Sequence, residues 1–384
     1  MARRRKIKKH TASKIIIAVV VILLIVAIAL GIFYAVAPEE FNALKEKLFP
    51  SEPSSPGTQP TLEGTLEMTV IDIGQGDCIF LQFPDGQTMI MDAGSTKGGS
   101  YTSIQEHLAL RAVEYLDYVF ITHTDQDHIK YLPDLFKEYD VRNVYMPYLQ
   151  EGDITTDIWT ETYEAIQNET YIDEEGNIAN CQVHYNVGDY VVSGKDWEMN
   201  CHSYLEDRYP ILKNADGHTK NAVSPVCFLE YADRIIVLTG DSNDENEPYL
   251  LKRGVLNVDA DILKVAHHGA RSSTSQEFLD AVDCEYAIIS YGEDNTYQHP
   301  HSELMQRLEN YADRTADNDY NGYKYVYETP KDGNVSVFVD GNGTLRIDCE
   351  LTDDKDFTLN WGEVAASAAD WLLPSRRYEV GLAA

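Results

Sequence analysis

Apolar residues after residue 64 follow two spacings, and each spacing predicts a different kind of element. Alternating or short continuous apolar runs between turn residues predict β-strands. Apolar residues that recur about every three or four positions predict amphipathic helices. The strand pattern covers residues 66–73, 78–83, 88–91, 118–121, 144–146, 181–187, 225–231, 234–238, 261–266, 286–290, 334–339 and 344–349. The helix pattern covers residues 101–115, 129–136, 154–168, 248–253, 275–281 and 304–311.

The order of these elements predicts the class of fold. Strands followed by helices occur in two successive halves of the chain, and a hairpin closes the second half. A sheet has to bury an apolar face against a second sheet or against helices. We therefore predict an α/β fold in which two sheets pack together with helices outside, which is a four-layer αββα sandwich.

Residues 15–37 form an uncharged apolar run behind a basic segment. The run is long enough to cross a bilayer as a helix, which takes about 20 residues. Basic residues mark the cytoplasmic side, so residues 1–14 are predicted to be a cytoplasmic tail and the rest of the chain extracytoplasmic. The alternative is a cleaved signal peptide, because Ala35-Val36-Ala37 resembles a cleavage site. We predict an uncleaved, single-pass anchor in the cell membrane.

Composition shifts set the remaining boundaries. Residues 38–63 read as a juxtamembrane segment and a Pro/Ser linker, residues 64–350 as the globular domain and residues 351–384 as a C-terminal extension to which the sequence assigns no role. The formal net charge is −32, from 31 basic and 63 acidic residues. A surface this acidic repels polyanions, so composition gives no support to sequence-independent nucleic-acid binding.

Six cysteines are scattered without any Cys-x-x-Cys pair. This spacing argues against a thiolate zinc site and against a disulfide-dense scaffold. Cys78, Cys227 and Cys349 lie in strand-like runs and are predicted to be small core residues, while one or two disulfides remain open for an extracytoplasmic domain.

Four potential metal ligands, His123, Asp125, Asp127 and His128, follow the predicted buried strand 118–121. Imidazole nitrogens and carboxylate oxygens at this density suit a divalent cation or a pair of them. The alternative is an acidic helix N-terminus in which the carboxylates favour the helix dipole and the histidines are incidental. Four ligands directly behind a buried strand favour the metal.

Further candidate ligands share this placement at a strand end. Loops at strand ends converge on one edge of a layered sheet structure, so residues far apart in the sequence can meet there. We therefore predict one site that joins the cluster after strand 118–121 to Asp92, Asp241, His267, His268 and His299.

These motifs resemble those of the metallo-β-lactamase-fold hydrolases, and specifically the extracytoplasmic hydrolase domain of ComEC-type DNA-uptake (competence) proteins. The matching segments are Ile71-Asp-Ile-Gly-Gln-Gly-Asp77, Asp92-Ala-Gly94, His123-x-Asp-x-Asp-His128, Gly240-Asp241, Lys264-Val-Ala-His-His-Gly269 and His299-Pro300. The family generally has a histidine where this chain has Asp125, a change typical of the ComEC-like branch.

The resemblance implies a cofactor of two divalent ions, Zn²⁺ or Mn²⁺. His123 and Asp125 would hold one ion, with Asp127, His128 and His299 on the other and Asp241 between them. His218 stays open as a third ligand of the first ion or as a surface histidine, because Asn221-Ala-Val-Ser224 matches the branch that lacks such a ligand.

The resemblance also implies roles around the ions. Asp92 would orient a ligand histidine without binding metal. Asp127 would serve catalysis as well as metal binding, and His267 or His268 would contact a substrate phosphate. Since neighbouring residues of an extended segment point in opposite directions, we expect at most one of these two histidines to face the metals. Lys264 and Arg271 flank the pair, and either could add positive charge near a phosphate. We favour the alternative that both are ordinary surface charges.

The expected activity is that of a membrane-anchored, extracytoplasmic, metal-dependent phosphodiesterase of the nuclease type that uses a metal-bridged hydroxide. DNA or a cell-wall phosphodiester is the expected substrate, and the sequence indicates the membrane but no specific protein as a partner. The alternatives are a lactam or lactone hydrolase of the same fold and a non-catalytic, metal-stabilised surface module in DNA uptake or cell-wall assembly.

Overall fold

The computed structural model describes residues 64–148, 156–173, 175–204, 216–315 and 325–351. All of them belong to the second of two compact units, Pro60–Ala384. The predicted cytoplasmic tail, transmembrane helix, linker and nearly all of the C-terminal extension lie outside the described residues. Within the described ranges, no helix combines the length and apolar character that a membrane crossing needs.

The first sheet has eight strands and is antiparallel on one side and parallel on the other. β3 pairs in parallel with β4, and β4 pairs in parallel with β5, while β1 lies antiparallel between β2 and β16. Its strand order is β17 (Leu345–Cys349), β16 (Val335–Asp340), β1 (Thr65–Val70), β2 (Cys78–Gln82), β3 (Thr88–Ala93), β4 (Tyr115–Phe120), β5 (Asp140–Met146) and β8 (Gln182–Tyr185).

The second sheet has seven strands and also changes from parallel to antiparallel pairing. β12, β13, β14 and β15 are parallel neighbours, and β9, β10 and β11 continue antiparallel from β12. Its order is β15 (Val326–Glu328), β14 (Tyr286–Ile289), β13 (Ile262–Lys264), β12 (Arg234–Leu238), β11 (Val226–Tyr231), β10 (Glu198–His202) and β9 (Asp189–Ser193). A separate two-stranded ribbon joins β6 (Thr170–Ile172) and β7 (Ile178–Asn180).

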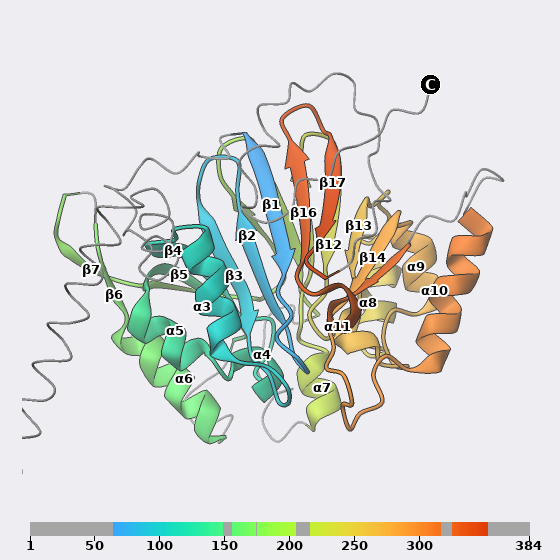
Figure 1. Ribbon diagram of the computed structural model, residues 1–384, viewed down its shortest axis with the longest axis horizontal. Helices are drawn as coiled ribbons and strands as arrows, with labels where there is room; N and C mark the ends of the chain where they lie inside the picture. The colour runs from blue at the N-terminus through green and yellow to red at the C-terminus, as the bar shows by residue number, and fades with distance from the viewer. Residues whose placement is uncertain (1–63, 149–155, 174, 205–215, 316–324, 352–384) are drawn as a thin grey trace, which may run out of the picture. The chain divides into compact units, whose positions relative to one another are not determined.

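Helices cover the outer face of each sheet (Figure 1). Those beside the first sheet are α3 (Tyr101–Leu110), α4 (Gln126–Ile129), α5 (Leu132–Glu138) and α6 (Asp157–Asn168), and those beside the second are α8 (Glu247–Arg253), α9 (Gln276–Val282) and α10 (Ser302–Thr315). The short helices are α7 (Gly217–Asn221), α11 (Thr329–Asp332) and the 3₁₀ segment η2 (Ala266–Gly269).

Three apolar cores confirm the predicted four layers. One core lies between the sheets and joins residues such as Met68 and Phe120 of the first sheet to Leu238 and Ile288 of the second. Two further cores lie between each sheet and its helices. Fully burying one large apolar side chain contributes roughly 1.5–3 kcal/mol to the stability of the fold. A shift of one residue in a strand would expose its apolar side chains, so alternation determines which face of the strand packs inward.

Some predicted boundaries differ from the structure. The predicted helix 101–115 ends at Leu110, because Tyr115 begins β4 and Ala112 turns the chain at a φ of 48°. The predicted helix 129–136 is divided between α4 and α5. The five strands β6, β7, β9, β10 and β15 were not predicted. The six cysteines, which all lie in the described residues, form no disulfide with one another, and Cys349, predicted to be a core residue, is only partly buried.

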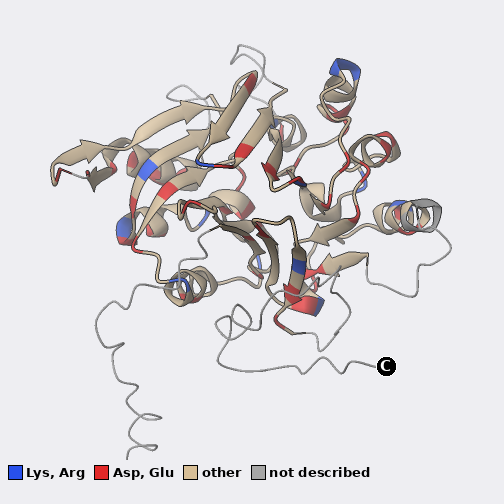
Figure 2. Cartoon of the chain, turned by 90° about the horizontal axis from the view of Figure 1, so that it is seen from above, with Lys and Arg blue, Asp and Glu red and all other residues tan. Residues whose placement is uncertain are grey.

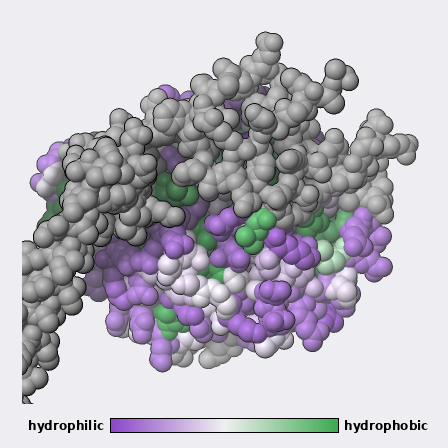
Figure 3. All heavy atoms as spheres, viewed as in Figure 1, coloured by the Kyte–Doolittle hydropathy of each residue, from purple (hydrophilic) through white to green (hydrophobic). Residues whose placement is uncertain are grey.

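The described surface is polar. Figure 3 shows mostly hydrophilic side chains on the face seen in Figure 1, with apolar residues standing apart from one another. In Figure 2, Asp and Glu positions, coloured red, are spread over many elements of the domain. This distribution agrees with the net charge of −32.

Candidate metal centre

The carboxylate of Asp241 lies at the centre of a histidine cluster where β12 ends. Asp241 is buried, and four imidazole nitrogens approach its two oxygens. Nε2 of His128 lies 3.1 Å and Nε2 of His268 3.8 Å from Oδ1. Nε2 of His123 lies 3.7 Å and Nε2 of His267 3.6 Å from Oδ2. The predicted meeting of distant strand ends therefore takes place, and α4 and α7 flank the same edge of the sandwich in Figure 1.

Asp92 was predicted to orient a ligand histidine, and in the structure its carboxylate contacts His128. Nδ1 of His128 lies 2.7 Å from Oδ2 of Asp92, and because a carboxylate only accepts, Nδ1 carries the hydrogen. Asp92 is fixed in turn by the backbone N–H and the hydroxyl of Thr122, at 2.9 and 2.7 Å. Nε2 of His128 is thereby directed toward Asp241.

His123 and His268 are oriented in the same way. Nδ1 of His123 lies 3.1 Å from the hydroxyl of Thr122 and 3.3 Å from that of Ser224. Nδ1 of His268 donates to the backbone carbonyl of Ser290 at 3.0 Å. In each of the three buried rings a partner outside the cluster therefore takes Nδ1 and leaves Nε2 to face inward.

Atoms without hydrogen bonds show that this cluster suits a divalent cation. Nε2 of His123, His128 and His268 and Oδ1 of Asp241 are buried and make no hydrogen bond in good geometry. Buried polar atoms are seldom left in this state, because each costs about 1–3 kcal/mol. Imidazole nitrogens and carboxylate oxygens are the ligands that Zn²⁺ and Mn²⁺ accept.

Candidate ligand atoms lie within 4.8 Å of one another in three overlapping groups of the described residues. The first joins His123, His128 and Asp241, and the second joins His128, Asp127 and His268. The third joins Asp241 and His268 to Asp77. The first two groups share His128, and the third shares Asp241 with the first and His268 with the second.

Asp125 and Asp127 stand at the start of α4, on the solvent side of the cluster. Oδ2 of Asp127 lies 3.5 Å from Nε2 of His268, and the Asp127 side chain is 16% exposed. Burial and the neighbouring carboxylates of Asp127 and Asp241 raise the pKa of Asp125 to about 6. A bound cation would reverse this shift, because it favours the charged carboxylate.

The prediction that His267 and His268 lie in an extended segment was wrong. They lie in η2 with φ values of 51° and 52°, which is the left-handed region. This turn brings both rings toward Asp241, whereas alternation would have separated them. His268 is buried and faces the metal ligands, while the side chain of His267 is 20% exposed at the rim.

His299, predicted to bind the same ion as Asp127 and His128, lies at the border of the cluster, and its buried Nδ1 makes no hydrogen bond. His299 is in none of the three groups, and its ring centroid lies 6.0 Å from that of His268 and 5.5 Å from that of His267. Burial, with His268 and His267 nearby, lowers the pKa of His299 to about 3. The residue therefore borders the cluster as a neutral imidazole.

The structure places His218 away from the cluster. Its Nε2 lies 2.7 Å from a carboxylate oxygen of Asp244, and its side chain is 39% exposed. Of the two roles left open for His218, the geometry favours that of a surface histidine. Asn221, three residues further along α7, does reach the site. Its amide oxygen accepts a hydrogen bond from Nε2 of His267, and its amide nitrogen donates to Oδ2 of Asp125, each at 3.1 Å.

Sequence reasoning missed the chemistry of Lys264 and Asp77. Lys264, interpreted as a surface charge, is fully buried, and its Nζ lies 2.9 Å from Oδ2 of Asp77. A lysine inside the apolar strand 261–266 was the available signal, because such a residue is rarely buried without a partner. Arg271 is on the surface as expected and pairs with Glu303 at 3.3 Å.

The carboxylates also shift the pKa values of the histidines. Burial disfavours a charged imidazole, yet Asp241 and Asp92 raise the pKa of His128 above its usual range. Burial is likewise outweighed at His268, where Asp241 and Asp77 raise the pKa to about 10. Without a cation these rings hold protons, and a metal ion would have to displace them.

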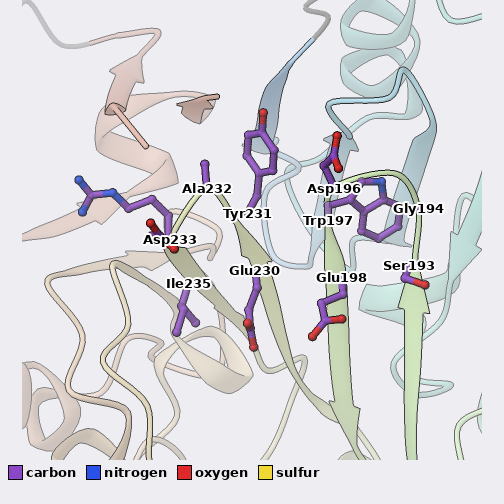
Figure 4. Close-up of a pocket in the computed structure, with 11 residues that line it drawn as sticks. Ser193, Gly194, Asp196, Trp197, Glu198, Glu230, Tyr231, Ala232, Asp233 and Ile235 are labelled. Carbon is purple, nitrogen blue, oxygen red and sulfur yellow. The ribbon is translucent and has the colours of Figure 1, made fainter. Parts of the chain in front are cut away.

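A separate hollow of about 710 Å³ lies at the other end of β12. Arg234, at the start of β12, contributes to it, whereas Asp241 follows the end of that strand. Figure 4 shows Asp196, Glu198, Glu230 and Asp233 among the residues that line it. None of the predicted site residues contributes to this hollow.

Comparisons with known proteins point to one family. Residues 71–164, which include the His123–His128 motif, match the family described as the Metallo-beta-lactamase superfamily. ComE operon protein 3 of Bacillus subtilis (strain 168) is 30% identical over 295 residues, which is 73% of this chain and 35% of that protein.

Two further relatives are more distant. Recombination protein 2 of Haemophilus influenzae is 25% identical over 64% of this chain and 27% of that protein. Competence protein ComA of Neisseria gonorrhoeae is 25% identical over 64% of this chain and 30% of that protein. The chain spans about a third of the length of the curated relatives it matches.

Proposed function

We propose that this chain, which carries the metallo-β-lactamase domain predicted from its sequence and is similar to competence proteins, is a metal-dependent hydrolase that cleaves phosphodiesters. One observation carries the proposal. Three buried imidazoles present unpartnered Nε2 atoms to the region around the buried carboxylate Asp241. A pair of divalent ions bound there would activate a water molecule and stabilise negative charge that develops on the substrate.

The proposed ligands are the members of the three groups other than Asp77. His123 and Asp241 would hold one ion. Asp127, His128 and His268 would hold the other together with Asp241. Asp125, predicted as a ligand of the first ion, is in none of the three groups. If it binds that ion, a carboxylate in place of an imidazole makes the ligand set harder and suits Mn²⁺ as well as Zn²⁺.

His267 is the residue proposed to contact the substrate. Its side chain is partly exposed, and Nε2 donates to the Asn221 amide, which leaves Nδ1 without a hydrogen bond. Burial lowers the pKa of His267, although Asp241 opposes the shift, so the ring is neutral near pH 7. A neutral, held imidazole at the rim can exchange a hydrogen bond or a proton with a substrate oxygen.

The phosphodiester assignment is supported by the kinship with proteins named for competence and recombination. DNA is one proposed substrate. The net charge of −32 opposes a long polyanion and favours a smaller or cell-wall phosphodiester. A lactam or lactone substrate has no comparable support, because nothing in the cluster selects an amide or an ester over a phosphate.

We also propose that residues 15–37 anchor the chain in the cell membrane with the domain outside the cytoplasm. The basic cluster before this run supports the orientation. Protease added to intact cells should digest the domain. A domain that is cleaved only after the cells are lysed would contradict this orientation.

The activity is tested with the full-length chain in detergent, loaded with Mn²⁺ or Zn²⁺ and offered bis-p-nitrophenyl phosphate. We expect turnover that is lost in Asp127→Ala. Two bound ions per chain without turnover would overturn the phosphodiesterase and would favour the non-catalytic, metal-stabilised module. Full activity in Asp127→Ala would overturn the assignment of the site.

A further inference from the structure

Lys264 is a buried cation in a strand that borders the apolar core between the two sheets. It lies in β13, a central strand of the second sheet, and is fully buried. Two positions earlier, Ile262 belongs to the core between the sheets, and alternation along the strand points Lys264 into the same layer. Its ammonium donates to Oδ2 of Asp77 at 2.9 Å and to the carbonyl of Val265 at 3.0 Å.

Such a pair does not by itself stabilise a fold. Two charges taken from water cost several kcal/mol each, and replacement of a buried pair by apolar residues is often neutral or stabilising. Removing only one partner is strongly destabilising, because it leaves a buried charge alone. Stability therefore does not explain the Lys264–Asp77 pair, whose role has to follow from what the pair contacts.

Asp77 connects the lysine to the metal centre. Its second oxygen, Oδ1, is buried without a hydrogen bond and lies 3.6 Å from Nδ1 of His268. The same Nδ1 donates to the carbonyl of Ser290 at 3.0 Å. Behind its Nδ1, His268 thus has one hydrogen-bond acceptor, the Ser290 carbonyl, and one carboxylate oxygen within ion-pair distance. Its Nε2 points to Asp127 and Asp241 at 3.5 and 3.8 Å.

The Lys264 ammonium also makes Asp77 a weaker ligand for a metal ion. Asp77, Asp241 and His268 form a group with the spacing of a cation site, and Lys264 already places one positive charge on Asp77. A carboxylate neutralised in this way competes less for a metal ion and stays available to His268.

We propose that Lys264 and Asp77 form a positioning pair for His268. Lys264 fixes the Asp77 carboxylate, and the carboxylate holds His268 with Nε2 directed at the metal position. Neither residue touches the metal or the substrate. The proposal rests on the metal centre of the proposed function and does not depend on which bond the enzyme cleaves.

The test removes both charges together, in the double variant Asp77→Asn/Lys264→Met, and measures Co²⁺ binding to the full-length chain by titration and visible absorption. The matched control is Glu67→Gln/Arg111→Met, which neutralises another ion pair, 2.7 Å apart, with a buried carboxylate and a partly buried guanidinium. We expect one of the bound ions to bind about 10- to 100-fold more weakly in the first variant, with an altered Co²⁺ spectrum, and no change in the control.

The possible outcomes separate this proposal from the proposed function. Wild-type affinity and spectrum in the first variant, or equal losses in both variants, would overturn the positioning role. A wild type that binds Co²⁺ but has no hydrolytic activity would overturn the phosphodiesterase alone. If the double variant does not fold, Asp77→Asn decides in the same titration, because it keeps the side-chain shape and an acceptor for Lys264, and unchanged Co²⁺ binding would again overturn the proposal.

Discussion

Nε2 of His128, in α4, lies 3.1 Å from Oδ1 of Asp241, which follows β12, and both side chains are buried. α4 follows β4 of the first sheet, whereas β12 belongs to the second sheet. The candidate metal centre therefore joins the two halves of the sandwich. A cation bound there would link both sheets, and binding would add to the stability of the folded state.

Asp241 should be the most sensitive position for metal binding, because its carboxylate lies in two of the three ligand groups. We predict that Asp241→Asn weakens the binding of both ions by at least about 100-fold. Equilibrium dialysis with metal analysis measures this effect. Asp244→Asn, on an exposed side chain three residues away, is the control and should bind as the wild type does. Equal binding in Asp241→Asn and the control would contradict the assignment.

Metal binding should release protons and should strengthen as pH rises. The neighbouring carboxylates raise the pKa of His268 to about 10 and also raise the pKa of His128, so protons compete with a cation for these rings near neutral pH. A metal ion binds only the deprotonated Nε2, so protonation competes with it and the competition weakens at higher pH. Calorimetry in buffers of different ionisation enthalpy should give a net release of protons at pH 7. A release of zero would contradict these protonation states.

The backbone at His267 should favour glycine over any residue with a Cβ. Its φ of 51° lies in the left-handed region, where a side chain costs roughly 1–2 kcal/mol. His267→Gly and His267→Ala both remove the imidazole, so their difference isolates the backbone. We expect the glycine variant to be more stable by about 1 kcal/mol in urea unfolding. Two variants of equal stability would show that the turn is not held in this conformation.

Glu169 should make stability depend on pH away from the metal centre. Burial raises its pKa from 4.5 to about 7, although a hydrogen bond from the backbone N–H of Val141 opposes the shift. A carboxyl with a raised pKa favours folding below its unfolded pKa, and this contribution is lost as pH rises through about 7. Glu169→Gln should therefore gain stability relative to the wild type between pH 5 and pH 8.

The matched control for this effect is Glu164→Gln, on an exposed side chain of the adjacent helix α6. Urea unfolding at both pH values gives the two differences. If Glu169→Gln and Glu164→Gln depended on pH in the same way, the shift at Glu169 would be disproved.

The layers of the fold follow from periodicity, and the structure confirms them. Alternation in segments such as 334–339, where Val335, Val337 and Val339 enter the core between the sheets, decides which face is buried, and that information is local. The strands β9 and β10 escaped detection because they have exposed polar residues on one face and lie at or near a sheet edge. β6 and β7 pair only with each other and bury little, so their pattern carries no core signal.

The cluster of His123, His128 and Asp241 was predictable because each residue directly follows a buried strand. The geometry of His267 and His268 was not, because it depends on a left-handed turn that no periodicity encodes. Lys264 was misjudged for a related reason. Its partner Asp77 is on a different sheet, and only the packing of the two sheets brings the charges together.

The most direct test of the central claim is the rate of bis-p-nitrophenyl phosphate hydrolysis as Mn²⁺ or Zn²⁺ is added to the metal-free, full-length chain. If the chain is a two-ion phosphodiesterase, the hydrolysis rate should rise until about two ions are bound per chain and then level off. Asp241→Asn should show no such rise. A rate that stays at the buffer level while two ions bind, or a rate that does not depend on added metal, would contradict the account.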